Sequence, residues 1–107
     1  MHIVTGGAGF IGSHLAYRIL DEEKEAKISV FDNFSSGKDW HLAGLKGAKN
    51  CSIINGDCKD KELLNKSMQG ADIVYHFASN PDISKAATEP EIDFWEGTYL
   101  TDRVLEA

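Results

Sequence analysis

The 107-residue sequence is poor in cysteine, in basic side chains and in long apolar runs. Its two cysteines, Cys51 and Cys58, match neither the C-x-x-C redox spacing nor a zinc pattern, so we expect buried free thiols. Eleven basic against seventeen acidic residues give a net charge of -6, which argues against a nucleic-acid or anionic-membrane partner. The short apolar runs and the absence of a basic-then-apolar leader predict a cytoplasmic protein.

The histidines give no support for a metal site. His2, His14, His41 and His76 are scattered along the chain. No H-x-x-x-H pair and no cluster of acidic residues brings them into ligand spacing. The sequence therefore predicts no metal centre.

Length and composition predict one globular domain, residues 1–107, because 42% of the residues are hydrophobic and suffice for a modest core. Short β-type runs alternate with helical patterns along it. We predict strands over residues 2–5, 28–31, 51–55 and 73–77. Between the first two strands, Ile11, Leu15 and Ile19 share one face of a helix that runs to about Asp21 or Glu23.

Turn and capping residues indicate the remaining elements. Residues 39–46 favour a short helix. Asp60 can cap another helix, which ends near Gly70 and has as its buried positions Leu63, Leu64 and Met68. A loop with Pro81 and Pro90 leads to the last helix. That helix carries two apolar stripes, one of Ile92, Trp95 and Tyr99 and one of Leu100, Val104 and Ala107.

Alternating strands and helices predict an α/β fold, a doubly wound parallel sheet of the Rossmann type with helices on both faces. Right-handed crossovers give the strand order 3-2-1-4 for these first four strands. In such a sheet a ligand crevice opens outside the carboxyl ends of the strands where the order reverses. We therefore expect the site beside the ends of the first and fourth strands.

Glycines gather at that position. Gly7, Gly9 and Gly12 spell G-x-G-x-x-G, and Gly6, Gly9 and Gly12 spell the looser G-x-x-G-x-x-G. Glycines here allow a tight turn and a close approach of backbone to a pyrophosphate, which the N–H groups at the helix start then bind. Taken alone, the pattern is equally typical of a plain glycine turn.

Asp32 favours the dinucleotide interpretation. It ends the second predicted strand, twenty residues after Gly12. A carboxylate at this place accepts both hydroxyls of an adenosine ribose and repels a 2'-phosphate. The sequence therefore predicts NAD as the cofactor in preference to NADP.

The sequence resembles the first part of the extended short-chain dehydrogenase/reductase family, in its branch of NAD-dependent nucleotide-sugar epimerases and dehydratases, of the UDP-glucose 4-epimerase type. The resemblance runs along all 107 residues and rests on TGGAGFIGSHL, DNFSSG, NGDCKD, VYHFAS and VLEA. It implies pyrophosphate contacts by Gly6, Gly9, Phe10, Ile11 and Gly12, and contacts to the adenosine ribose by Asp32 and Asn33. It further implies contacts to the neighbouring phosphate and ribose by Ser35, Ser36 and Gly37, to adenine by Asp57 and Cys58, and to the middle of the cofactor by Phe77, Ala78 and Ser79.

Some positions depart from the family pattern. Pro81 stands about where many epimerases carry a cofactor-binding lysine. Aligned back from VLEA, the family's N-x-x-G-T-x-N falls on Gly97, Leu100, Thr101 and Arg103, so only the threonine is kept. His76 is common in the family at the end of the fourth strand, and we interpret it as structural.

The catalytic pair of the family is missing from these residues. In that family a tyrosine, activated by a lysine four residues further on, takes a sugar hydroxyl proton while hydride passes to the cofactor. Here the residues four positions after Tyr17, Tyr75 and Tyr99 are Asp21, Ser79 and Arg103. We therefore expect no catalytic residue, and we expect a fragment or truncated product that does not turn over substrate by itself.

The resemblance also implies partners. The full-length protein would bind a nucleotide sugar, and the last helix belongs to the pair through which family members form homodimers. The fourth strand, lacking a fifth neighbour, would be an open edge that favours self-association. Two other interpretations stay open: a non-catalytic dinucleotide-binding module, such as a redox-responsive regulator, and a degenerate gene product that binds nothing.

Overall fold

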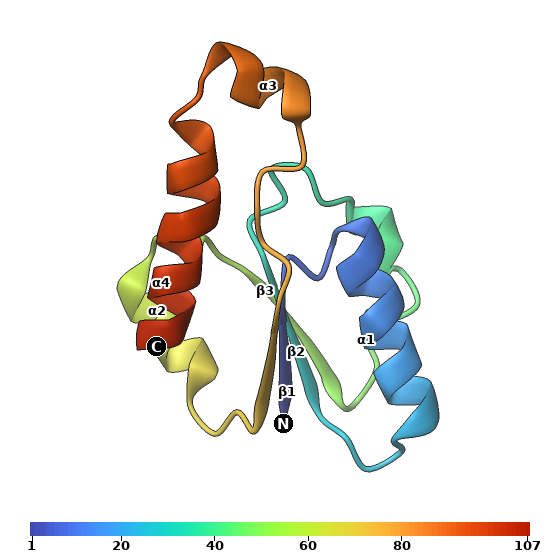
Figure 1. The fold of residues 1–107 in the computed structure, drawn as a ribbon. Coiled ribbons are helices and arrows are strands. Elements are labelled where there is room, and N and C mark those ends of the chain that lie inside the picture. The colour runs from blue at the N-terminus through green and yellow to red at the C-terminus, as the bar shows by residue number, and fades with distance from the viewer.

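Four parallel strands form the centre of the molecule (Figure 1). The computed structural model describes all residues from Met1 to Ala107. The strands are β1 (His2–Thr5), β2 (Ile28–Asp32), β3 (Cys51–Asn55) and β4 (Ile73–His76). Their order is β3-β2-β1-β4 and every neighbouring pair is parallel, which confirms the predicted doubly wound sheet.

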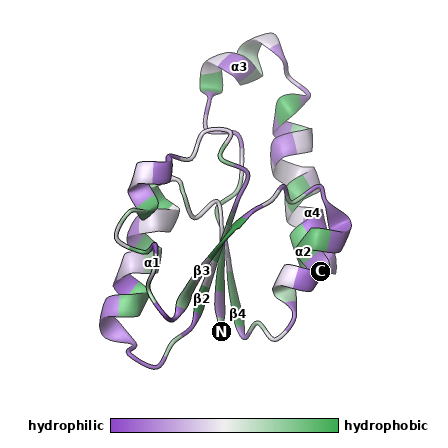
Figure 2. Ribbon diagram, turned by 180° about the vertical axis from the view of Figure 1, so that it is seen from behind, coloured by the Kyte–Doolittle hydropathy of each residue, from purple (hydrophilic) through white to green (hydrophobic).

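The two central strands are buried on both faces, because side chains alternate along a strand and helices cover each side. Val4 and Val30, both fully buried, pack with α1 (Phe10–Glu22) in one cluster. Ile3 and Phe31 point the other way, into a cluster with α2 (Lys61–Met68) and α4 (Tyr99–Glu106). Figure 2 shows the apolar strands between helices of mixed polarity. Each such side chain contributes about 1.5–3 kcal/mol by leaving water.

The helix ends follow the predicted signals. The Asp60 carboxylate accepts a hydrogen bond from Leu63 N–H at 3.1 Å and caps α2. Gly70, two residues beyond Met68, has φ +79°, the left-handed conformation that favours glycine after a helix. Leu64 and Met68 are buried as predicted, whereas Leu63 is only partly buried. The α1 helix ends at Glu22, within the expected range.

The structure differs from the predictions at other elements. Residues 39–46 form only the 3-10 turn η1 (Asp39–Leu42). The loop between the prolines contains α3 (Ile83–Thr88), whose N-cap Asp82 accepts from Lys85 N–H at 3.1 Å. Of the two cysteines, Cys58 is buried but Cys51 is only partly so. Ala107 is exposed instead of completing a buried stripe.

The last helix is also less regular than its apolar stripes suggest. It contains a π-helical turn, η2 (Phe94–Thr98), in which Tyr99 N–H bonds to the Phe94 carbonyl five residues earlier. Leu100 is buried and Val104 packs beside it, as predicted, but Trp95 on the other stripe is 48% exposed. No helix in the structure combines the length and the apolar character needed to cross a membrane.

Candidate functional site

A cleft of about 750 Å³ opens at the carboxyl ends of the strands, where the sheet order reverses between β1 and β4. The loops after all four strands, the start of α1 and the last helix with its π turn line it. The structure brings every predicted contact residue to this cleft: Gly6, Gly9, Phe10, Ile11, Gly12, Asp32, Asn33, Ser35, Ser36, Gly37, Asp57, Cys58, Phe77, Ala78 and Ser79. The cleft therefore lies where the sequence predicts the site.

The glycines divide into two roles. A Cβ added at Gly12 would lie 2.5 Å from the Gly6 carbonyl oxygen, and one at Gly6 would lie 2.7 Å from the Ala78 amide nitrogen. Gly6 also has φ +70°. These two glycines let the loop fold against itself and against the end of β4. A Cβ at Gly9 would meet only the Gly6 oxygen, at 3.2 Å, so Gly9 leaves its cleft side open.

The start of α1 offers free donors to the cleft. Gly9 is its N-cap and has no side chain that could bond the first-turn amides. Ser13 N–H makes the first bond of the helix, to the Gly9 carbonyl at 3.0 Å. The amides of Phe10, Ile11 and Gly12 precede it and have no intrahelical acceptor. Together with the helix dipole they suit an anionic group such as a phosphate.

The Asp32 carboxylate joins two loops beneath the cleft. It is 8% exposed, its Oδ2 accepts from Ala8 N–H at 2.9 Å, and its Oδ1 accepts from Phe34 N–H at 2.7 Å. Phe34 has φ +60°, an uncommon conformation for a bulky residue, and it brings that amide to the carboxylate. An ionised carboxylate has about four acceptor sites, so two remain for hydroxyl groups in the cleft.

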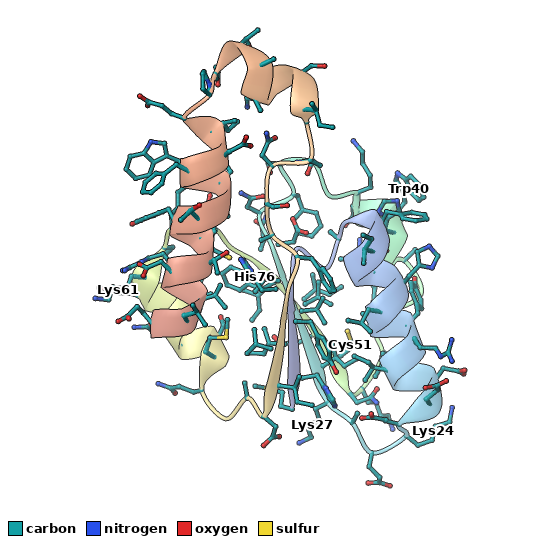
Figure 3. The ribbon with its side chains drawn as sticks, viewed as in Figure 1. Lys24, Lys27, Trp40, Cys51, Lys61 and His76 are labelled. Carbon is teal, nitrogen blue, oxygen red and sulfur yellow. The ribbon has the colours of Figure 1, made fainter.

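Residues after the DNFSSG turn add contacts that the sequence did not predict. Lys38 N–H and His41 Nδ1 both donate to the Ala8 carbonyl, at 3.0 and 2.7 Å. These bonds hold the loop after β2 against the glycine loop. Lys38, Trp40 and His41 all line the cleft, and the Trp40 indole, labelled in Figure 3, is 71% exposed at its edge.

The loop after β3 forms the opposite end of the cleft. Asp57 accepts from Asn33 Nδ2 at 3.1 Å and from Lys59 N–H at 2.8 Å. Burial, together with the nearby carboxylates of Asp57, Asp32 and Glu96, raises the pKa of Cys58 to about 12. The thiol is therefore protonated near neutral pH and is a packing group, not a nucleophile.

His76 lies at the end of β4 between the two helical layers (Figure 3). Its Nδ1 hydrogen-bonds to the Thr5 hydroxyl at 2.6 Å, and the residue lines the cleft. Burial lowers the pKa of His76 from its usual 6.5, so the ring is neutral at neutral pH. The bond to Thr5, on the neighbouring strand, agrees with a structural role.

The last helix supplies the remaining wall through Glu96, Gly97, Leu100 and Thr101. The Thr101 hydroxyl donates to the Gly97 carbonyl at 3.1 Å. Three of the four positions aligned back from VLEA, Gly97, Leu100 and Thr101, therefore line the cleft. The fourth, Arg103, lies against Tyr99, with its guanidinium 5.5 Å from the ring centroid. Pro81 also borders the cleft, where it offers no charge to a ligand.

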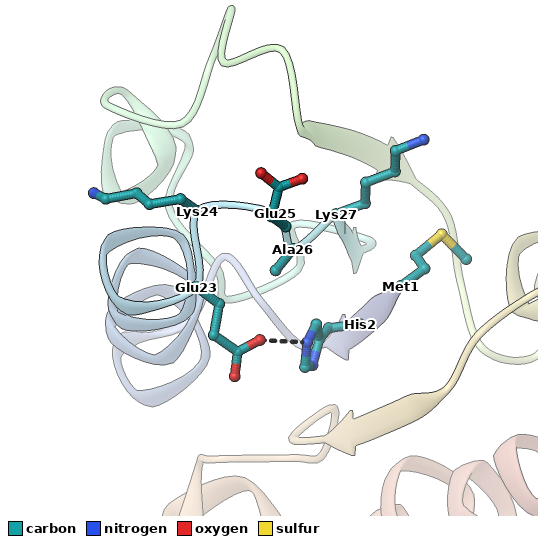
Figure 4. A pocket seen from close by; sticks show the side chains of 7 residues that line it. All are labelled: Met1, His2, Glu23, Lys24, Glu25, Ala26 and Lys27. Atoms are coloured by element: carbon teal, nitrogen blue, oxygen red, sulfur yellow. Dashed lines mark hydrogen bonds and ion pairs between the residues drawn. The ribbon is translucent and has the colours of Figure 1, made fainter.

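A second, shallower hollow of about 490 Å³ lies at the opposite end of the strands (Figure 4). His2 and Glu23 pair across it at 3.0 Å, beside lysines of the turn before β2. It contains none of the predicted contact residues, and its charges are mixed. We therefore assign the functional site to the larger cleft.

Comparison with known proteins agrees with this geometry. Residues 2–107 match the NAD dependent epimerase/dehydratase family. The chain is 31% identical over 106 residues to a dTDP-glucose 4,6-dehydratase of Mycobacterium tuberculosis, covering 98% of this chain and 31% of the relative. It is 30% identical over 105 residues to a UDP-glucose 4-epimerase of Halalkalibacterium halodurans, covering 96% of this chain and 29% of the relative.

A solved structure shares the fold closely. A double mutant of dTDP-glucose 4,6-dehydratase from Streptomyces venezuelae, solved with NAD bound, superposes with a TM-score of 0.92 at 26% identity. The match covers 99% of this chain and 34% of that one, so the chain spans about a third of the length of its relatives. On the match of residues 2–107, the chain belongs to the NAD dependent epimerase/dehydratase family.

Proposed function

We propose that this chain binds NAD in the cleft at the carboxyl ends of its strands. The observation that carries the proposal is the pairing of Asp32, buried and held by two backbone amides, with the uncapped start of α1. A carboxylate acceptor and a set of free N–H donors suit a ribose diol and a pyrophosphate. The open side of Gly9 gives the backbone access that a phosphate needs.

Each segment that lines the cleft then binds a different part of NAD. The amides of the α1 start bind the pyrophosphate, Asp32 and Asn33 the adenosine ribose, and the serine turn after Phe34 the adjoining phosphate and ribose. Asp57 and Cys58 face adenine, while the residues after β4 line the middle of the cofactor. These residues are those that the family resemblance implied: Gly6, Gly9, Phe10, Ile11, Gly12, Asp32, Asn33, Ser35, Ser36, Gly37, Asp57, Cys58, Phe77, Ala78 and Ser79.

We further propose that the whole protein is a nucleotide-sugar epimerase or dehydratase, of the UDP-glucose 4-epimerase type. NAD would supply the acceptor for a hydride from C4 of the sugar. No Y-x-x-x-K occurs among the 107 residues, so we expect this chain to bind the cofactor without turning over a sugar nucleotide. A non-catalytic dinucleotide-binding module is the alternative, and a Y-x-x-x-K in a longer form of the protein would decide against it.

We expect the protein to act in the cytoplasm. Its last helix is a candidate surface for self-association. Its aromatic side chains Phe94 and Trp95 are 50% and 48% exposed, and the Trp95 ring makes edge-to-face contacts with Phe94 and Tyr99. A homodimer through this helix would cover them. Sedimentation should then show a dimer that Trp95→Glu converts to monomer, and a wild-type monomer at high concentration would contradict this part of the proposal.

Titration with NADH tests cofactor binding directly. Trp40 lines the cleft and Trp95 lies in the π turn, so we expect NADH to quench their fluorescence in a saturable way. NADPH should bind at least about ten-fold more weakly, because Asp32 repels the 2'-phosphate. Equal affinities would refute the role of Asp32, and no quenching with no heat in calorimetry would refute binding itself.

A further inference from the structure

One ion pair joins the two sides of the cleft. Lys59, in the loop between β3 and α2, pairs through Nζ with Oε1 of Glu96 in the π turn of the last helix. The two residues are 37 positions apart in sequence. None of the other ion pairs includes a residue that lines the cleft.

The loop end of this pair is fixed by further bonds. Lys59 N–H donates to Asp57 Oδ1 at 2.8 Å, and Asp57 Oδ2 accepts from Asn33 Nδ2 at 3.1 Å. A continuous polar chain therefore runs from the end of β2, through the loop after β3, to the last helix. Asn33, Asp57 and Glu96 all line the cleft along the way.

The helix end of the pair has few other attachments near the cleft. Leu100 is the only buried residue of η2 and α4, and the other side chains that pack on the core, Tyr99 and Val104, follow the π turn. A Cβ added at Gly97 would meet nothing within 4 Å. A π turn is a short, irregular feature that is frequent at functional sites. Glu96 makes the one side-chain hydrogen bond that joins the π turn to a segment outside the last helix.

We propose that the Lys59–Glu96 pair is a latch that holds the π turn against the adenine end of the cleft and prepares it for the dinucleotide. Lys59 and Glu96 act as positioning residues, through the placement of Asp57 and of the helix wall. The proposal rests on the proposed binding of NAD. Preformed walls raise affinity because less ordering remains to be done when the ligand binds.

Both side chains are partly exposed, 38% for Lys59 and 30% for Glu96, and many exposed ion pairs contribute nothing measurable. The coupling energy between the two substitutions distinguishes the proposed latch from an ion pair that contributes nothing. If the two charges act together, removing both should weaken binding no more than removing one. Lys59→Arg keeps the charge and should keep the affinity.

Calorimetric titration with NAD provides the first test. We expect Lys59→Met and Glu96→Gln each to bind NAD about three- to five-fold more weakly, with the double variant no weaker than either. Lys59→Arg should stay within about two-fold of wild type. Glu22→Gln, which breaks the Arg18–Glu22 pair on α1 away from the cleft, is the matched control and should leave affinity unchanged.

Hydrogen exchange without ligand provides the second test. The amides of residues 94–101 should exchange faster in Lys59→Met and Glu96→Gln than in wild type or Glu22→Gln. Wild-type affinity in the single variants, additive losses in the double variant or unchanged exchange would each overturn the latch. If wild type itself fails to bind NAD, the proposed function fails, and the exchange experiment still decides whether the pair holds the π turn.

Discussion

The two sides of the cleft are built differently. The side formed by the glycine loop and the end of β2 is made of backbone in close contact, fixed by buried Asp32 and by bonds to the Ala8 carbonyl. The side formed by the last helix is made of partly exposed side chains, and Leu100 is its one buried residue. The Lys59–Glu96 ion pair connects it to the loop after β3. The first side suits the pyrophosphate and the adenosine ribose of NAD, whose free 2'-hydroxyl can donate a hydrogen bond to Asp32. The second side, which has few buried contacts, can change its conformation more easily.

Substitution of glycine on the backbone side should have the largest effect. We expect Gly12→Val to lose about 3 kcal/mol of stability or to fail to fold, because its Cβ would lie 2.5 Å from the Gly6 oxygen and 2.8 Å from the Gly7 Cα. Urea denaturation measures the change. A stable Gly12→Val protein with a wild-type midpoint would show that this side is looser than the structure implies.

Neutralising Asp32 should come next in size. An asparagine amide can accept from only one of the two amides, Ala8 N–H and Phe34 N–H, that the carboxylate now satisfies. We expect Asp32→Asn to cost about 1.5–3 kcal/mol of stability and to weaken NADH binding at least about ten-fold. Thermal unfolding and fluorescence titration measure the two effects. Binding of NADH at wild-type strength would remove the main support for the cofactor site.

The neutral ring of His76 should make stability depend on pH. Burial lowers its pKa from 6.5 in the folded state, so the unfolded chain binds more protons near and below that pH. This contribution is complete above about pH 6.5 and is lost as the pH falls towards the lowered folded pKa. Melting curves at about pH 5 and 7 should differ less for His76→Gln than for wild type. An equal difference between the two pH values in both proteins would mean that protonation of His76 does not contribute to the pH dependence of stability.

The smallest effect is expected at Gly97, on the helix side. A Cβ there meets nothing within 4 Å, and alanine favours helix over glycine. Gly97→Ala should therefore raise stability by about 0.5–1 kcal/mol, the opposite sign to Gly12→Val. Chemical denaturation of both variants side by side sharpens the comparison. A destabilised Gly97→Ala would show that the π turn requires glycine.

Features set by near neighbours in the sequence could be predicted. The strands, the Asp60 cap, the left-handed Gly70 and the glycine loop with Asp32 each depend on a local pattern, and each lies where that pattern indicates. The strand order also followed, because right-handed crossovers leave few topologies for alternating elements.

Features that depend on distant contacts were missed. His41 lines the cleft, and its ring hydrogen-bonds to the Ala8 carbonyl, 33 residues away. A periodic pattern in the sequence cannot predict a bond between residues so far apart. The π turn changes hydrogen bonding within a sequence whose apolar stripes still read as an ordinary helix. The α3 helix formed from a short segment with no buried residues, and Asp82 capping it was the only local signal.

The state of Cys58 limits how this protein can respond to oxidants. Because burial and the neighbouring carboxylates raise the pKa of Cys58 to about 12, the thiol stays protonated at neutral pH, so disulfide exchange and alkylation there are slow. Purification without a reducing agent should leave the adenine end chemically intact. Any sensitivity of the cleft to cellular redox balance would then come through the ratio of oxidised to reduced coenzyme, with sulfur chemistry playing no part.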